Sequence, residues 1–188
     1  MKIFMIICNP KEHSSKDAYV QTYIEEATMR GHEVRTINVY DYDIDYLRAN
    51  GDEMDYSLPS ELKQAQDNLI WANQLVFVYP VWCLSIPALL KSFMDRVFAE
   101  GVAAEYSDRG PKPLMKDKTA VIMHSYSMPC VAMKYFYGDI LMKWWKVVLT
   151  DWCGPKIVKR FDFDMIDDVS EKRKQKWIND VKKFVAKL

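Results

Sequence analysis

Residues 75–98, LVFVYPVWCLSIPALLKSFMDRVF, carry the pattern that decides the fold. The first five are apolar without interruption, as in a parallel strand that is covered on both faces. Pro80 then fixes φ where the chain leaves this strand and removes one backbone donor. Beyond Ser85 the apolar residues recur at helical spacing, at Ile86, Leu89, Leu90, Phe93, Met94, Val97 and Phe98. The stretch therefore predicts a buried strand, a loop and an amphipathic helix.

The same alternation extends to both sides of this unit. Further strands are expected at residues 3–8, 34–40, 119–124 and 156–161, the last at an edge, and helices at 17–30, after Pro59-Ser60, at 131–149 and towards Leu188. Residues 41–58 read as an acidic, Tyr-rich loop. Five strands alternating with helices predict a doubly wound α/β fold, a five-stranded parallel sheet in the flavodoxin-like order 2-1-3-4-5 with helices on both faces. Because no linker or repeat divides the chain, we expect one domain over residues 1–188.

Charge and cysteine usage narrow the functional classes. The 26 basic and 26 acidic side chains balance, which argues against a nucleic-acid-binding protein. The apolar start at residues 1–8 is too short for a signal peptide, and no run reaches the ~20 apolar residues of a membrane span. The four cysteines at 8, 83, 130 and 153 show no metal-ligand spacing. We therefore expect a cytoplasmic protein with free thiols, without membrane insertion and without a metal site.

Ligands of open α/β sheets lie beyond the carboxyl ends of the strands, so three loops are candidates for a binding site. The first, NPKEHSSKD at residues 9–17, leads into the first predicted helix, whose free N–H groups favour an anion. A phosphate is expected to bind there through His13, Ser14, Ser15 and Lys16, and Asn9 at the start of the loop is a further candidate for cofactor binding. The alternative is that the serines simply cap the helix.

The second loop, YPVWCLSIP at residues 79–87, follows the central strand. Past Pro80, the backbone N–H groups of Val81, Trp82 and Cys83 are expected to meet the polar edge of a flat ligand. Trp82 and Leu84 are expected to form its apolar walls. The alternative is that these two side chains belong to the core or to an interface.

The run YPVWCLSIPALLKSFMDRVF, residues 79–98, resembles a segment of the NAD(P)H:quinone oxidoreductase family, which includes bacterial quinone reductases and ancillary reductases of potassium-efflux systems. Weaker similarity extends to Asn9-Pro10 with Ser14-Ser15, to residues 38–41 and 108–111, and to Cys153-Gly154. The resemblance implies a flavodoxin-like fold, a bound flavin and a homodimer with active sites near the interface. We expect FMN, because the chain has no extension to hold an adenosine; FAD is the alternative.

The third loop, HSYSMP at residues 124–129, departs from the family, which usually carries Thr-Gly-Gly there. Ser125 and Tyr126 are the residues expected to contact the edge of the flavin ring. The Gly138-Asp139 pair aligns with a similar pair in the family, and this alignment puts Tyr137 where a catalytic His stands. Tyr137 is therefore the candidate catalytic residue, with packing on the sheet as the alternative. Tyr106 is expected to line the acceptor pocket.

Together these features predict a flavin-dependent oxidoreductase. It would pass hydride from NAD(P)H through the bound flavin to a quinone or similar small acceptor, by a ping-pong mechanism because one site serves both substrates. Two alternatives stay open. One is a regulatory subunit that binds a partner protein and has little reductase activity, and the other is a flavodoxin-type electron carrier.

Overall fold

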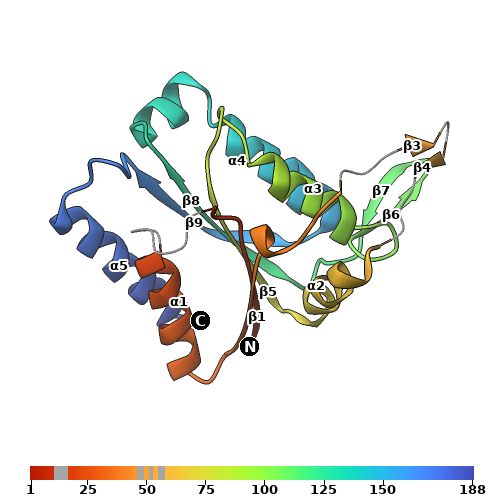
Figure 1. Cartoon of the computed structure of the whole chain (residues 1–188), viewed down its shortest axis with the longest axis horizontal. Helices are drawn as coiled ribbons and strands as arrows, with labels where there is room; N and C mark the ends of the chain where they lie inside the picture. Colours follow the sequence, from red (N-terminus) through yellow and green to blue (C-terminus); the bar gives the residue numbers. More distant parts are fainter. Residues whose placement is uncertain (11–16, 46–48, 51–52, 55–57) are drawn as a thin grey trace.

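A computed structural model of the chain describes residues 1–10, 17–45, 49–50, 53–54 and 58–188. Its centre is a sheet in the order β2-β1-β5-β8-β9, in which every neighbouring pair is parallel (Figure 1). The strands are β1 (Lys2–Ile7), β2 (Glu33–Asn38), β5 (Gln74–Pro80), β8 (Thr119–Tyr126) and β9 (Lys156–Asp164). The five-stranded flavodoxin-like order predicted from the sequence is therefore confirmed, with β9 at one edge.

Helices cover both faces of this sheet (Figure 1). On one face lie α1 (Asp17–Met29) and α5 (Glu171–Val185), and on the other lie α2 (Ser60–Trp71), α3 (Ala88–Val97) and α4 (Ile140–Trp145). The central strand β5 is buried along its whole length. Its Val76 and Val78 pack towards α1 and α5, whereas Phe77 and Tyr79 pack towards α3 and α4. Burial on both faces explains why this strand is apolar without alternation.

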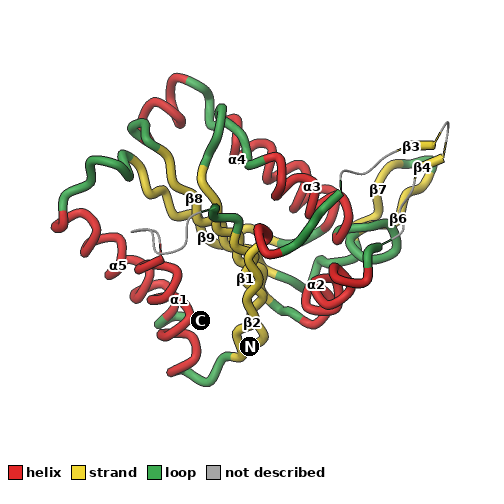
Figure 2. The backbone as a smooth tube through the Cα atoms, in the orientation of Figure 1, coloured by secondary structure: helices red, strands yellow, loops and turns green. Residues whose placement is uncertain are grey.

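The helix predicted over residues 131–149 is interrupted, and the prediction of a continuous helix is wrong. A π-helical segment, Ala132–Phe136, precedes α4, and a second one, Lys146–Cys153, follows it (Figure 2). Between the first segment and α4, Gly138 and Asp139 have φ of 64° and 55°. Two successive residues in the left-handed region cannot continue a right-handed helix, so the chain turns there.

Two short hairpins also lie outside the sequence-based prediction. β6 (Ala104–Ser107) pairs antiparallel with β7 (Gly110–Pro113), and β3 (Ala49–Asn50) pairs with β4 (Glu53–Met54). Strands this short have too few residues to show a period of two. A 3₁₀ turn, Val39–Asp41, ends the stretch predicted as the second strand. Among the described residues, none of the helices is long and apolar enough to cross a bilayer.

Candidate functional site

The loops that follow β1, β5 and β8 meet at the carboxyl edge of the sheet. Backbone hydrogen bonds join them, with Cys8 N–H donating to the Val78 carbonyl at 2.8 Å and Val81 N–H to the Ser125 carbonyl at 2.8 Å. A small pocket opens between them, lined by Ile7, Asn9, Tyr19, Val78, Pro80 and Ser125. Its position is the one that the strand order predicts for a ligand.

Ser125 is the residue of this pocket whose side chain has an unused hydrogen-bonding group. It is 1% exposed, and its Oγ has no hydrogen-bond partner in the part of the chain that the structure describes. A buried hydroxyl without a partner costs about 1–3 kcal/mol, so such groups are rare in folded proteins. A polar ligand atom in the pocket would remove that cost. The chemistry of this wall therefore fits a ligand with a polar edge.

The other two loops contribute unequally. Asn9 is 9% exposed, and its carbonyl accepts a hydrogen bond from Asn38 Nδ2 at 3.3 Å. Tyr19, in the first turns of α1, stacks on Phe163 with ring centroids 3.7 Å apart. The predicted phosphate-binding residues His13, Ser14, Ser15 and Lys16 lie outside the described residues.

The loop after β5 forms a tight turn rather than an open row of donors. Trp82 N–H donates to the Ser85 carbonyl at 3.0 Å, and Ser85 N–H donates back to the Trp82 carbonyl at 2.9 Å. The expectation that the N–H groups of Val81 and Trp82 are free for a ligand is therefore wrong, because both serve the turn and the neighbouring loop. Cys83 and Leu84 hold φ of 48° and 61° at its tip.

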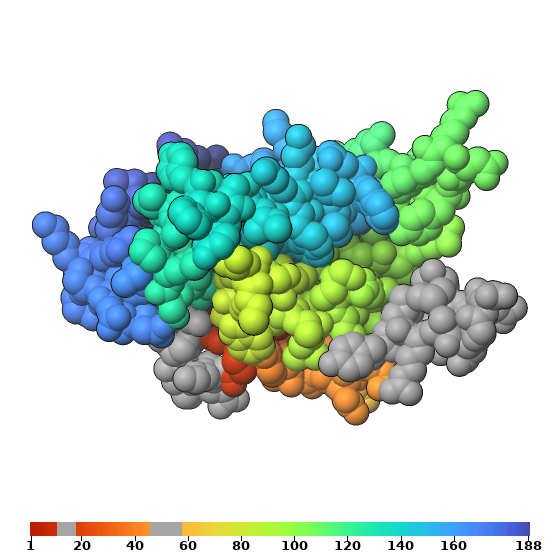
Figure 3. All heavy atoms as spheres, turned by 90° about the horizontal axis from the view of Figure 1, so that it is seen from above, coloured from red at the N-terminus to blue at the C-terminus, as the bar shows by residue number. Residues whose placement is uncertain are grey.

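Trp82 lies at the surface, 47% exposed, and so does not belong to the core. Together with Pro87, Lys91 and Trp144 it lines a separate, open depression on the surface. Figure 3 shows this loop against the segment that follows β8, on one face of the molecule.

The left-handed tip of this turn leads to a first prediction. Leu84→Gly should raise the free energy of unfolding of the ligand-free protein by about 0.5 kcal/mol, because glycine adopts positive φ without strain. Because the sequence predicts that Leu84 forms an apolar wall of the flavin site, the same change should weaken FMN binding about tenfold. Urea denaturation and an FMN fluorescence titration measure the two effects.

The matched control is Cys83→Gly, which relieves similar strain but removes a smaller side chain. We expect a similar gain in stability and a smaller loss of FMN affinity. If both variants bind FMN as tightly as the original chain, the turn is not part of the flavin site.

A chain of buried hydrogen bonds runs beneath the third loop. Trp145 Nε1–H donates to the Tyr79 hydroxyl at 2.6 Å, and that hydroxyl lies 3.1 Å from His124 Nδ1. His124 Nε2 lies 2.7 Å from Asp162 Oδ1. Every donor finds an acceptor if His124 is neutral and carries its proton on Nε2. A second proton on this ring would be carried by Nδ1, and it would point at the hydrogen that the Tyr79 hydroxyl donates to the same nitrogen.

Asp162 is the centre of the network. Its Oδ1 also accepts hydrogen bonds from the Tyr126 hydroxyl at 2.8 Å and from Arg160 Nε at 2.5 Å, and its Oδ2 pairs with Lys134 Nζ at 2.8 Å. Burial alone would raise the pKa of Asp162, yet hydrogen bonds from His124 and Lys134 and the charge of Arg160 hold it well below its usual range. The carboxylate is therefore ionised and fully surrounded by donors.

Burial lowers the pKa of His124, which is 0% exposed, and outweighs the opposing effect of Asp162. Arg160 and Lys134 already neutralise the carboxylate, so Asp162 does little to favour a charged ring. The unfolded chain binds a proton at this residue below about pH 6.5, whereas the folded chain does not. Stability from the neutral ring is thus present above that pH and is lost as the pH falls below it, by up to about 1.4 kcal/mol per unit.

The second prediction follows from this sign. The free energy of unfolding should fall between pH 7 and pH 5, and His124→Gln should remove much of that slope. Urea titrations across the pH range measure both. His32→Gln is the control. Burial and the charges of the amino terminus and Arg30 also lower the pKa of His32, but His32 lies at the surface, 2.8 Å from the amino-terminal nitrogen, so its removal should reduce the slope less than His124→Gln does. A slope that disappears in the control and persists in His124→Gln would contradict the assignment.

The remaining predicted residues are scattered. Tyr126 is 4% exposed, and its hydroxyl bonds to Asp162 rather than pointing to a ligand, so its predicted ring contact does not hold for the hydroxyl. Tyr137 is 43% exposed and packs edge-on against Phe136. Tyr106 lies on β6, against Trp152 in a separate groove beside Met94 and Val148. The structure therefore brings Asn9, Pro80 and Ser125 together but not Tyr106.

Sequence reasoning missed the buried network. One signal was present, since the last strand reads RFDFD at residues 160–164, with charges alternating with phenylalanines. In a strand that packs on both faces, charged side chains at alternate positions all point to the same face, where each needs a group of opposite charge or a hydrogen-bond partner. Arg160 meets that need through both oxygens of Asp139, each at 2.7 Å.

Comparison with known proteins agrees with this architecture. The flavodoxin-like fold family matches residues 1–188. An FMN-dependent NADH:quinone oxidoreductase of Clostridium perfringens is 24% identical over 197 residues, covering 98% of this chain and 96% of the relative. The structure of Smu.1420 from Streptococcus mutans superposes with a TM-score of 0.86 at 26% identity, covering 100% of both chains. A Bacillus anthracis FMN-dependent NADH-azoreductase in complex with FMN gives 0.77 at 17% identity, over 99% of this chain and 98% of its own, which supports the fold alone.

Proposed function

The chain belongs to the flavodoxin-like fold family, and we propose that it is an FMN-dependent NADH oxidoreductase that reduces a quinone or a similar small acceptor. One observation carries the proposal. The pocket at the carboxyl edge of β1, β5 and β8 contains the buried, unpartnered hydroxyl of Ser125. The same edge holds the flavin in the flavodoxin-like order. FMN is proposed rather than FAD, and NADH rather than NADPH, because the similar proteins are named for them.

The residues of this chain would bind and orient the cofactor. Asn9, Pro80 and Ser125 would hold the polar edge of the ring in the pocket. Trp82 and Leu84 would cover its apolar face, and Cys83 would contribute backbone from the left-handed turn. His13, Ser14, Ser15 and Lys16 would bind the phosphate at the start of α1. When bound, FMN supplies two-electron transfer between NADH and the acceptor, in turn at one site, which predicts ping-pong kinetics.

Tyr137 is the proposed catalytic residue. Its hydroxyl would donate a hydrogen bond that stabilises negative charge on the reduced ring. Tyr137→Phe should therefore slow the reduction by NADH about tenfold or more, with little change in FMN affinity. Anaerobic stopped-flow absorbance measures the rate. Tyr135→Phe is the matched control, because Tyr135 is a neighbouring tyrosine that is 83% exposed, and it should leave the rate unchanged.

A homodimer is the proposed assembly. Exposed apolar residues follow one another around α4, namely Phe136, Ile140, Val147 and Trp152. A monomer rarely leaves so many large apolar groups in water without a partner. Tyr106 lies away from its own pocket, so its proposed role in acceptor binding requires the second copy. The mass in solution, measured by light scattering, tests the dimer.

The decisive experiment is spectroscopic. The purified protein, incubated with FMN and desalted, should show flavin absorption bands, and NADH added without oxygen should bleach them. A quinone added afterwards should restore them. A protein that stays colourless after incubation would contradict the proposal and favour a flavin-free, partner-binding role. A flavin that NADH does not bleach would favour an electron carrier.

A further inference from the structure

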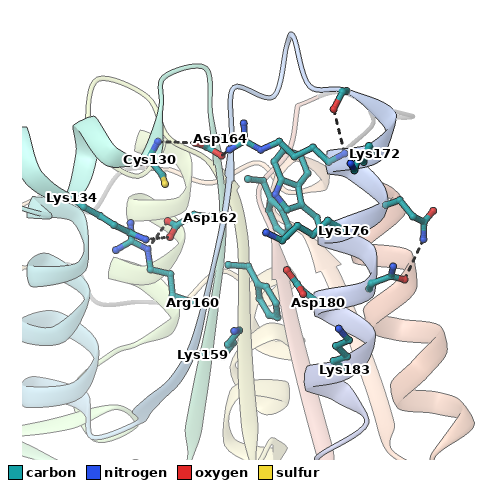
Figure 4. Close-up of a pocket in the computed structure, with 17 residues that line it drawn as sticks. Cys130, Lys134, Lys159, Arg160, Asp162, Asp164, Lys172, Lys176, Asp180 and Lys183 are labelled. Atoms are coloured by element: carbon teal, nitrogen blue, oxygen red, sulfur yellow. Dashed lines mark hydrogen bonds and ion pairs between the residues drawn. The ribbon is translucent and has the colours of Figure 1, made fainter.

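The open edge of the sheet forms a slot that the proposed reductase activity does not use. β9 ends the strand order, and in the described part of the chain β8 is its one partner strand. The outer backbone groups of β9 therefore lack a neighbouring strand. A groove of about 1080 Å³ lies along this edge. Figure 4 shows β9 between two walls, with Cys130 and Lys134 on one side and α5 on the other.

Charge distinguishes this slot from the rest of the molecule. The chain as a whole has a formal net charge of zero. The slot is lined by seven cationic side chains and three carboxylates, a local excess of positive charge. A neutral protein with such a concentration of one sign in a concave surface attracts ligands of the opposite sign.

The carboxylates of β9 do not neutralise the α5 wall. Asp162 is paired with Lys134 and Arg160, and Asp164 is paired with Arg173 at 2.5 Å. Lys172, Lys176 and Lys183 all point from α5 towards the slot in Figure 4, and none of them makes an ion pair with the described residues. All three are exposed. The three lysines form a row on α5. Asp180 lies on the same wall between Lys176 and Lys183, so the α5 wall presents three cations and one carboxylate, a net excess of positive charge along the open strand.

The length of this row favours an extended ligand. From Lys172 to Lys183 the helix rises about 16 Å, at 1.5 Å per residue. A single phosphate cannot reach such separated charges, whereas five residues of an extended peptide span about 17 Å. The floor of the slot offers the backbone groups that such a peptide pairs with. Both the length of the lysine row and the free backbone groups of β9 therefore favour an extended peptide strand as the ligand.

Edge strands normally carry features that prevent pairing, and β9 has them too. A bulge shifts its register next to Val158, and Lys159 and Arg160 follow. A basic edge repels other basic strands, including the Lys159-Arg160 stretch of β9 in a second copy, and attracts an acidic one. We propose that the slot between β9 and α5 binds an extended acidic segment of a partner protein, which adds a strand to β9 while its carboxylates face Lys172, Lys176 and Lys183.

A synthetic peptide tests the proposal with the full chain. The probe is a fluorescein-labelled heptapeptide of alternating glutamate and valine, followed by fluorescence anisotropy. Saturable binding below ~1 mM is expected, and it should weaken as salt is added. Amides of β9 should exchange more slowly with deuterium when the peptide is bound. A peptide N-methylated at every residue, which cannot donate to a strand from either of its edges, should bind at least about tenfold more weakly.

Charge reversal identifies the surface. The triple variant Lys172→Glu, Lys176→Glu and Lys183→Glu should weaken binding by more than about tenfold. The matched control reverses three exposed lysines outside the slot, Lys63, Lys116 and Lys187, and should bind nearly as tightly as the original chain. Circular dichroism establishes that both variants are folded. The flavin spectrum and NADH turnover should not change, so the outcome is independent of the proposed reductase function.

Several results would overturn the proposal. No binding of the acidic peptide at ~1 mM would do so, and so would equal loss in the triple variant and its control. Unchanged binding of the N-methylated peptide would exclude strand addition. Tighter binding of hexathymidylate than of the peptide, lost in the triple variant, would assign the slot to nucleic acid instead.

Discussion

Asp162→Asn is expected to lower the free energy of unfolding by about 3–5 kcal/mol. The side chain of Asp162 is 13% exposed, and its charge is surrounded by Arg160, Lys134 and the rings of His124 and Tyr126. The amide would leave the partly buried guanidinium without its closest counter-ion. It would also place an N–H₂ group among groups that are themselves donors. Urea denaturation followed by tryptophan fluorescence measures the loss.

Asp168→Asn is the matched control for this prediction. It makes the same change at an exposed carboxylate close by in the sequence, and surface substitutions of this kind stay within about 0.5 kcal/mol. Equal losses in the two variants would show that the network does not stabilise the fold. Because Lys134 and Asp139 tie the segment after β8 to β9, we also expect Asp162→Asn to weaken FMN binding.

Gly154→Ala is expected to cost about 3 kcal/mol, because strain and a backbone clash combine. Gly154 has φ of +113°, where side chains are disfavoured. A Cβ atom there would lie 2.7 Å from the Lys116 nitrogen and 2.9 Å from the Met115 carbonyl carbon. Both neighbours are backbone atoms, and Met115 N–H is held by the Cys153 carbonyl at 2.9 Å. The clash therefore cannot be relieved by rotating a side chain.

Gly101→Ala separates the two contributions. Gly101 also has positive φ, +78°, but nothing lies within 4 Å of an added Cβ. It should lose only the conformational part, about 1 kcal/mol. Thermal or urea denaturation of both variants gives the comparison. If Gly154→Ala loses no more than Gly101→Ala, the close approach of Met115 and Lys116 does not constrain the chain.

The fold could be predicted largely from local patterns. Leu75–Tyr79 is continuously apolar because both faces of β5 are covered, and the stripe from Ile86 to Phe98 marks the buried face of α3. The prediction failed at residues 131–149, where the apolar pattern did not reveal a break in the helix. The apolar residues of 131–149 suit a helix, but Gly138 and Asp139 both take left-handed backbone and break it.

The candidate site was predicted only in part. Pro80 and Ser125 lie at the carboxyl ends of the paired parallel strands β5 and β8, so topology alone puts them together. The N–H groups of Val81 and Trp82 were predicted to be free for a ligand. They are instead used within the fold, by the Ser125 carbonyl and by the turn around Cys83 and Leu84. Tyr126, also predicted at the ring, points instead to Asp162, because alternate residues of a strand face opposite sides of the sheet.

Local patterns in the chain were enough to predict the order of strands and helices, the strand, loop and helix of residues 75–98 and the family resemblance. Those properties follow from periodicity and from residues close together in the chain. Only the tertiary structure decided that His124 meets Asp162, 38 residues away, and that Lys172, Lys176 and Lys183 face an open strand. Such contacts depend on strand register and on where a helix packs, and neither is encoded in any local pattern.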